Sequence, residues 1–229
     1  SADPIEQKAS EGGAWPAILT WRAHNLPRME SVRVQLSGNR IKAYGRIVSA
    51  ATETTPAFSA SYDLVTDEAG GTKRLSMTVT LAERERQLSI ARDEENMWLV
   101  QDPTGQTSRA AYDGALDVDV VFSPFFNALP IRRTGVYRRA DAVSLPIVYV
   151  WLPDLTVEPV TIGYTSDRAD NHDIKLLSPV ADTIIQVDDD GFIVAESAAV
   201  VLYVAEKAGK LIPADFQGRT RVVQWCFAA

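Results

Sequence analysis

Short segments in which apolar and polar residues alternate recur along most of this chain, separated by residues typical of turns. The clearest segment, residues 75–81 (LSMTVTL), has an apolar side chain at every second position. Successive side chains of an extended chain point to opposite faces, so this pattern predicts a strand with one face on a core and one in water. Turn residues at 37–39 (SGN) and 68–71 (EAGG) join such segments as antiparallel neighbours. The chain is therefore expected to be mainly β.

Two changes of pattern divide the chain into three parts. Residues 1–14 are small and polar and are expected to form a flexible N-terminal arm, whereas residues 15–195 carry the strand pattern. Residues 196–229 change to helical spacing and predict a helical appendage, with one helix at 198–208 and a second at 217–229. Strands are expected at 17–21, 32–36, 41–48, 57–66, 75–81, 87–92, 97–101, 143–152, 160–165, 173–177, 182–187 and 192–194.

The stretch at 116–133 (LDVDVVFSPFFNALPIRR) combines charged and apolar residues in an unusual way. Asp117 and Asp119 alternate with aliphatic residues, so both carboxylates are expected on one face of a half-buried strand. A Ser-Pro pair then ends the strand, because proline cannot donate to a ladder, and a compact apolar loop follows. Arg132 and Arg133 come just after this loop. We expect the two guanidinium groups to pair with the two carboxylates in a structural charge network.

Composition and charge narrow the classes of function. The chain has 229 residues, with 23 Lys and Arg against 30 Asp and Glu, and a formal charge of -7 disfavours a nucleic-acid partner. With one cysteine, Cys226, and two distant histidines, His24 and His172, neither a disulfide framework nor a zinc site is expected. Residues 188–191 (DDDG) lack the spacing of a calcium loop and predict a turn. We expect no metal and no cofactor.

The sequence carries no signal for a membrane segment or for export. It contains no apolar run of about 18 residues, so no integral membrane segment is expected. The first residues lack the basic and apolar regions of a signal peptide. A cytoplasmic location is therefore the default expectation.

One motif in the central stretch resembles a known family. Residues 117–133 (DVDVVFSPFFNALPIRR) strongly resemble the hallmark of the putative glycolipid-binding family, long catalogued as a domain of unknown function. Further similar segments are found at 20–22, 114–119, 151–153 and 187–194, so the resemblance covers about residues 18–194. It implies a mainly β (α+β) fold, a curved antiparallel sheet forming an open or half barrel, similar to bacterial lipoprotein-localisation carriers. The two C-terminal helices expected from the spacing in residues 196–229 would follow this sheet. Lipid binding in that family is inferred from shape.

A second resemblance concerns the tail. Residues 196–215, with Arg219 and the pair at 224–225, resemble the end of the thioredoxin-like half of a glutathione S-transferase and the start of its helical half. In that family the Glu-Ser pair precedes a helix whose N-terminus receives a glutathione carboxylate. The upstream catalytic residue and βαβ unit have no counterpart in this chain. The tail is therefore expected to pack on the β domain or to support homo-oligomerisation, with a glutathione-related role as the alternative.

The leading hypothesis is non-enzymatic binding or carriage of a lipid-like or glycolipid-like amphipathic ligand in the concavity of the curved sheet. For each aromatic candidate the plainer role is core packing. The candidate ligand-binding residues combine an apolar lining with polar groups that would orient a head group: Phe125, Phe126, Asn127, Leu129, Arg132, Arg133, Trp151 and Tyr164.

An alternative hypothesis makes the chain a glycoside or acyl-ester hydrolase in which Asp117 and Asp119 serve as acid and base. Strand geometry separates their Cα atoms by about 6 to 7 Å, a spacing that glycosidic chemistry could use. No Ser-His-Asp or Cys-His arrangement is legible in the sequence, so no residue is assigned a catalytic role.

Overall fold

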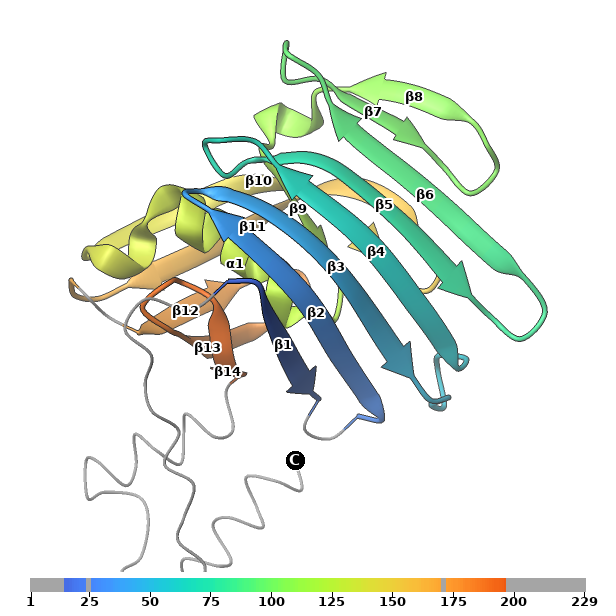
Figure 1. The fold of residues 1–229 in the computed structure, drawn as a ribbon, viewed down its shortest axis with the longest axis horizontal. Coiled ribbons are helices and arrows are strands. Elements are labelled where there is room, and N and C mark those ends of the chain that lie inside the picture. Colours follow the sequence, from blue (N-terminus) through green and yellow to red (C-terminus); the bar gives the residue numbers. More distant parts are fainter. Residues whose placement is uncertain (1–14, 24–25, 170–171, 197–229) are drawn as a thin grey trace, which may run out of the picture.

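The computed structural model describes residues 15–23, 26–169 and 172–196, which form two β-sheets and an α-helix (Figure 1). In the first sheet, each of the eight strands is antiparallel to the next one in the chain. These strands are β1 (Ala17–Arg22), β2 (Arg28–Ser37), β3 (Arg40–Ser49), β4 (Phe58–Thr66), β5 (Thr72–Thr80), β6 (Glu85–Arg92), β7 (Trp98–Gln101) and β8 (Thr107–Ala110). Sequence alternation predicts the first seven, whereas β8 is a short exposed strand without an apolar pattern.

The second sheet has six strands in the order β14-β13-β12-β11-β10-β9. These strands are β9 (Asp117–Val120), β10 (Asp141–Trp151), β11 (Thr156–Ser166), β12 (Asp173–Leu177), β13 (Asp182–Val187) and β14 (Ile193–Glu196). Neighbours are antiparallel except β9 and β10, which are parallel. The chain between these two strands forms α1 (Pro124–Thr134) and the 3₁₀ turn η2 (Val136–Arg138), and the 3₁₀ turn η1 (Tyr112–Gly114) precedes β9.

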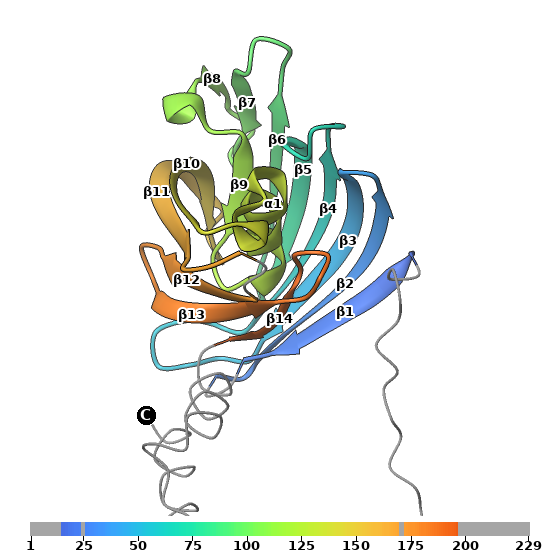
Figure 2. The same cartoon turned by 90° about the vertical axis from the view of Figure 1, so that its left-hand side faces the viewer.

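The two curved sheets face each other, and α1 lies between them (Figure 2). The eight-stranded sheet curves as a half-barrel around the helix. Trp21 Nε1 in β1 donates a hydrogen bond to the Ile193 carbonyl in β14, at 2.9 Å, which joins the edges of the two sheets. On the other side, the Thr72 N–H donates to the Leu116 carbonyl just before β9, at 2.9 Å. The expected mainly β fold with a half-barrel is confirmed, with two sheets in place of one.

Side-chain alternation sets the inner face of the eight-stranded sheet. In β4 every second side chain is buried, and Tyr62 is one of these. Gly45 in β3 is the register partner of Tyr62. A Cβ atom at Gly45 would lie 2.0 Å from Tyr62 Cζ, so only glycine leaves room for the ring.

The apolar loop expected after residue 123 is instead the helix α1. Pro124 lies in its first turn, where the missing N–H costs little, and Gly135 follows its end in the left-handed conformation with φ 67°. Residues 125–131 are all buried. The loop prediction was wrong because a helix covered on every side lacks the amphipathic stripe that identifies surface helices.

β9 also differs from the half-buried strand expected there. Residues 117–120 are all buried, because β9 contacts α1 and β5 in addition to its partner β10. Asp117 and Asp119 share one face, as alternation predicts, but the opposite face is covered as well.

The turn predicted at 188–191 is present. The Asp188 carboxylate accepts hydrogen bonds from the N–H groups of Asp190 and Phe192, at 3.0 and 2.9 Å, and Gly191 has φ 81°. Glu196, expected at the start of the helical appendage, is the last residue of β14. The arm at 1–14 and the two helices predicted within 197–229 lie outside the described residues, so these predictions stay untested.

Candidate functional site

The predicted apolar lining fills the space between the two sheets. Phe125, Phe126, Leu129 and Tyr164 are at most 1 % exposed. The rings of Phe125 and Phe126 pack edge to face with centroids 5.5 Å apart, and the Tyr62 ring lies 5.0 Å from that of Phe126. These side chains of α1 and β11 thus pack in the space between the sheets, where they were expected to line a ligand site.

A buried polar group accompanies this packing. The Tyr164 hydroxyl donates to Asn127 Oδ1 at 3.0 Å, which links β11 to α1. Burial raises the pKa of Tyr164 well above its ordinary value, and the charge of Asp119 raises it further. Burial and Asp119 likewise raise the pKa of Tyr149 in β10. Asp119 is the register partner of Tyr149 in the parallel β9-β10 pair.

The predicted pairing of Asp117 with an arginine is present. Arg133, in the last turn of α1, donates through Nε and Nη2 to Asp117 Oδ2 at 3.0 and 2.7 Å. Asp117 is 0 % exposed, and burial raises its pKa while the Arg133 guanidinium opposes that rise. The pair fastens the end of α1 to β9. A carboxylate closed to solvent in this way gives the hydrolase hypothesis no geometric support.

Arg132 does not join this pair, so the expected network of four charges is split. Its Nη1 donates to the Asp190 carbonyl, and its guanidinium lies 4.7 Å from the centroid of the Phe192 ring. Burial lowers the pKa of Arg132. A Cβ atom at Gly191 would lie 2.9 Å from Arg132 Cγ. Arg132 therefore holds the 188–191 turn against α1.

Trp151, the remaining predicted lining residue, ends β10. Its Nε1 donates to Glu158 Oε1 in β11 at 2.6 Å, and its ring packs edge to face on Tyr149 with centroids 5.0 Å apart. The side chain is partly exposed. Trp151 thus stabilises the β10-β11 hairpin.

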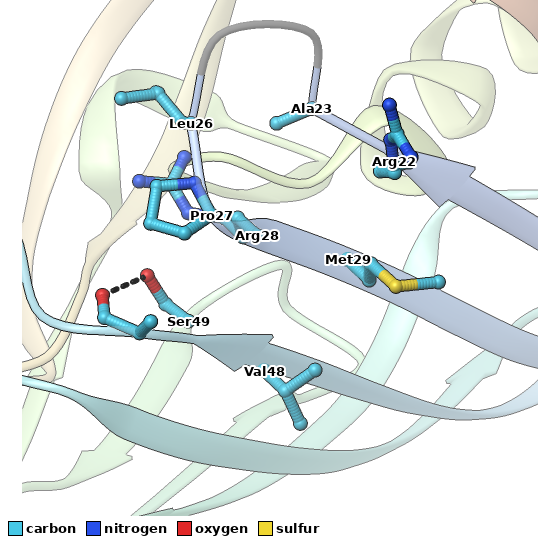
Figure 3. A pocket seen from close by; sticks show the side chains of 9 residues that line it. Arg22, Ala23, Leu26, Pro27, Arg28, Met29, Val48 and Ser49 are labelled. Atoms are coloured by element: carbon cyan, nitrogen blue, oxygen red, sulfur yellow. Dashed lines mark hydrogen bonds between the residues drawn. The ribbon is translucent and has the colours of Figure 1, made fainter.

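A hollow of about 690 Å³ opens where β1 ends, β2 begins and β3 ends (Figure 3). Two lining residues are joined by a hydrogen bond, in which Ser49 Oγ donates to the Ala50 carbonyl at 3.1 Å. Met29 and Val48 are 45 % and 42 % exposed, so the hollow has an accessible apolar wall. The residues that line the hollow include Arg22, Leu26, Arg28, Met29, Val48 and Ser49.

Arg28 is the buried charge of the hollow. It is 8 % exposed, and its Nε is buried without a hydrogen-bond partner. Its guanidinium lies 3.6 Å from the centroid of the Phe122 ring, and burial lowers its pKa. No carboxylate within 15–23, 26–169 and 172–196 forms an ion pair with it. An arginine of this kind is expected to attract an anion.

Glu30, two residues further along β2, connects this region to α1. It is 2 % exposed, and its Oε1 accepts hydrogen bonds from the Tyr62 hydroxyl at 2.5 Å and the Ser123 hydroxyl at 2.7 Å. Its Oε2 accepts the Phe125 N–H at 3.5 Å. Ser123 makes no capping hydrogen bond of its own, so Glu30 supplies an acceptor to the first turn of the helix.

Sequence reasoning missed Arg28 and Glu30, although a signal for both was present. They have the same parity in β2 as Val32 and Val34, which the alternation assigns to the core. Charged residues are rarely buried in proteins. Two of them on the inward face of one strand therefore indicate a polar site in the interior.

The described part of the chain offers no cluster of three or more His, Cys, Asp or Glu side chains that could hold a metal ion. Its helices are all too short or too polar to cross a membrane.

A solved structure shares this fold. The crystal structure of a DUF1089 family protein from Pseudomonas aeruginosa matches with a TM-score of 0.59 and 21 % identity, over 82 % of this chain and 94 % of that one. At this identity the likeness establishes the fold alone. No curated protein matches the sequence. A family model described as "Putative glycolipid-binding" matches residues 18–200, and the chain therefore belongs to the putative glycolipid-binding family.

Proposed function

We propose that this protein binds, without converting it, a lipid-like or glycolipid-like amphipathic molecule that carries an anionic group. The hollow at the ends of β1, β2 and β3 is the proposed site. One observation carries the proposal: Arg28 is among the residues that line the hollow, is buried, and forms no ion pair with a carboxylate of the described residues. A carboxylate or phosphate of the ligand would supply the missing counter-ion.

The energetics of a buried arginine favour such a ligand. Removing a charged group from water costs on the order of several kcal/mol, and the cation–π contact with Phe122 returns about 0.5 to 2 kcal/mol. The planar guanidinium matches the two oxygens of a carboxylate or phosphate. An anion beside Arg28 therefore gains more free energy than one beside an exposed arginine.

The apolar wall supports an amphipathic ligand over a free anion. Leu26, Met29 and Val48 are 46 %, 45 % and 42 % exposed and line the same hollow. Its volume of about 690 Å³ lies within the range of small-molecule sites. This space suits a head group together with the first part of an aliphatic chain.

The family description suggests a ligand that contains a sugar, and the arginines of the hollow favour a ligand that carries an anionic group. The shared chemistry is an anion attached to an apolar chain. A carboxylate would come from a fatty acid or an acidic sugar, and a phosphate from a phospholipid or a phosphorylated glycolipid. Binding experiments with a fatty acid and with a phospholipid distinguish a carboxylate ligand from a phosphate ligand.

Four soluble probes test the proposal: a fluorescent fatty acid, lysophosphatidic acid, an uncharged monoacylglycerol and inorganic phosphate. We expect the fatty acid, the lysophosphatidic acid or both to bind, monoacylglycerol to bind more weakly, and phosphate alone not to compete. Arg28→Met keeps the length of the side chain and removes its charge. It is expected to weaken anion binding about 10- to 100-fold, the range for charge-assisted hydrogen bonds.

The control for this variant is Arg84→Met, which removes an exposed arginine that does not line the hollow. Val48→Asp adds a negative charge to the exposed wall and is expected to repel the anion without disturbing the core. Thermal unfolding shows which variants are folded. Equal affinity for the uncharged lipid, or unchanged affinity in folded Arg28→Met and Val48→Asp, would exclude the proposed site.

A further inference from the structure

The outer side of β1, β2 and β3 carries charges of one sign. We call this surface the cationic face and define it by the outward-pointing positions 18–22, 29–37 and 40–48 of these strands. Its charged side chains are all exposed and all basic: Arg22, Arg33, Arg40, Lys42 and Arg46. None of the five forms an ion pair among the described residues.

This segregation of charge contrasts with the whole chain, which carries a formal charge of -7. In the β3-β4 register, the first acidic residue of the outer side is Asp63, opposite Tyr44. Glu30, the acidic residue of β2, is buried on the inner side. A basic surface on an acidic protein indicates a partner of negative charge.

Apolar side chains lie between these cations. Ile18 is 71 % exposed, Tyr44 55 %, Met29 45 % and Val48 42 %. In the strand registers Ile18 stands beside Arg33, and Arg33 stands beside Tyr44. Exposed aliphatic and aromatic residues among arginines and lysines are typical of proteins that bind the interface of a bilayer.

We propose that the cationic face docks this protein on an anionic lipid bilayer. The basic side chains contact acidic head groups, while Ile18, Tyr44 and Met29 enter the boundary between head groups and acyl chains. The hollow shares Arg22, Met29 and Val48 with this face. Docking therefore places its mouth at the membrane surface, which, if the proposed function holds, is where its ligand resides.

Nucleic acid is the competing partner for a basic surface. Phosphate neutralisation would use the five cations but would gain nothing from burying Ile18 or Val48. Stacking of bases needs a platform of aromatic residues, and the outward positions of β1 to β3 offer Tyr44 alone. The mixture of aliphatic and basic side chains thus favours a bilayer.

Vesicle co-sedimentation of the full chain tests the docking. One set of vesicles is pure phosphatidylcholine and the other contains about 30 % phosphatidylserine, which supplies the surface charge. We expect binding to the second set alone, and its loss when the salt concentration rises from about 0.1 M to about 1 M. Each cation near such a surface strengthens binding about fivefold, so Arg33→Gln with Arg46→Gln is expected to weaken it about 25-fold.

Two matched variants separate docking from other effects. Arg84→Gln with Arg168→Gln removes two exposed cations outside the cationic face and is expected to leave vesicle binding unchanged. Ile18→Ser keeps every charge and is expected to weaken binding to vesicles without affecting salt-sensitive binding to heparin.

The outcomes for docking and for the hollow are independent. The Arg33 and Arg46 variant leaves the hollow intact, so its affinity for soluble lysophosphatidic acid is expected to stay constant. Arg28→Met is expected to dock as the wild type does. Equal binding to both vesicle sets, equal loss in the two double variants, or RNA binding without vesicle binding would overturn the docking proposal and leave the hollow to its own test.

Discussion

At the scale of single residues, the buried charges of this protein differ in how they are compensated. Asp117 has a two-point ion pair with Arg133, and the Glu30 carboxylate accepts two hydroxyl groups. Arg28 has an aromatic ring above it and no ion pair within the described residues. Charges of the first kind stabilise the fold, whereas Arg28 is the residue that we propose binds an anion.

The first of these pairs gives a direct prediction. Asp117→Asn leaves the Arg133 guanidinium, whose side chain is 19 % exposed, without its counter-ion. We expect the free energy of unfolding to fall by about 3 to 5 kcal/mol, as when a buried pair loses one partner. Urea unfolding of the purified variant measures this change.

The control uses a surface pair of the same chemistry. Arg139 donates to Asp141 at 2.8 Å, and the Arg139 side chain is 59 % exposed. Asp141→Asn is expected to leave the urea midpoint nearly unchanged, because water solvates the remaining arginine. If the two variants lose the same stability, the Asp117 pair does not have the role assigned to it.

At the scale of elements, the inner face of the eight-stranded sheet positions the helix. Tyr62 crosses Gly45 and reaches Glu30 with its hydroxyl, and Glu30 in turn bonds the first turn of α1. Burial and the charge of Glu30 raise the pKa of Tyr62 well above its ordinary value, so the phenol stays protonated as the donor. The side chains of Tyr62 and Glu30 thus couple β2, β3, β4 and α1.

Gly45→Ala tests this coupling. The added methyl group would overlap the Tyr62 ring, so we expect a loss of about 1 to 3 kcal/mol of unfolding free energy, the range for overpacking a core. Combining it with Tyr62→Leu, which removes the ring, is expected to add less loss than the sum of the two single variants.

Gly163 in β11 is the matched control for this substitution. A Cβ atom there would lie 3.7 Å from Leu177 Cβ, an ordinary contact. Gly163→Ala is therefore expected to keep or slightly raise the thermal unfolding midpoint. A Gly45→Ala variant as stable as Gly163→Ala would show that the ring moves aside without cost.

At the scale of the whole molecule, two sheets close around α1 and meet at the β1 and β14 edges. The hydrogen bond from Trp21 Nε1 to the Ile193 carbonyl spans this seam, and Trp15 packs on Phe192 beside it with ring centroids 5.1 Å apart. The hollow and the cationic face both include β1. Both proposals therefore require that β1 stays paired at the edge of its sheet.

Trp21→Phe tests the closure, because it removes the indole donor and keeps an aromatic ring. We expect about 1 kcal/mol less stability, the usual contribution of a hydrogen bond. Amide hydrogen exchange is expected to accelerate in β1 and β14 and to stay unchanged in β5 and β6. Uniform acceleration across all strands would instead indicate global destabilisation and contradict a local seam.

The sequence predicted some contacts of the site and missed others. The pairing of Asp117 with an arginine was predictable, because the two opposite charges are close in sequence. Apolar residues surround both of them, and a buried charge is stabilised by an opposite charge. The separate direction of Arg132 was not, because its partner is the 188–191 turn, far along the chain. The burial of Asp117 and Asp119, the two carboxylates of the hydrolase alternative, was not predictable either, because no local pattern reports which distant segment covers a side chain.

The sequence by itself determined most of the strands, since side-chain alternation in β2 to β7 and in β12 and β13 is a local property of an extended chain. It also determined the turn at 188–191 and the family. Only the tertiary structure decided that residues 124–134 form a helix, that both faces of β9 are buried, and that Arg28 lines a hollow. The physical reason is that the burial of one face of a strand depends on which distant segment packs against that face. Alternation in the sequence shows only that the strand has two different faces.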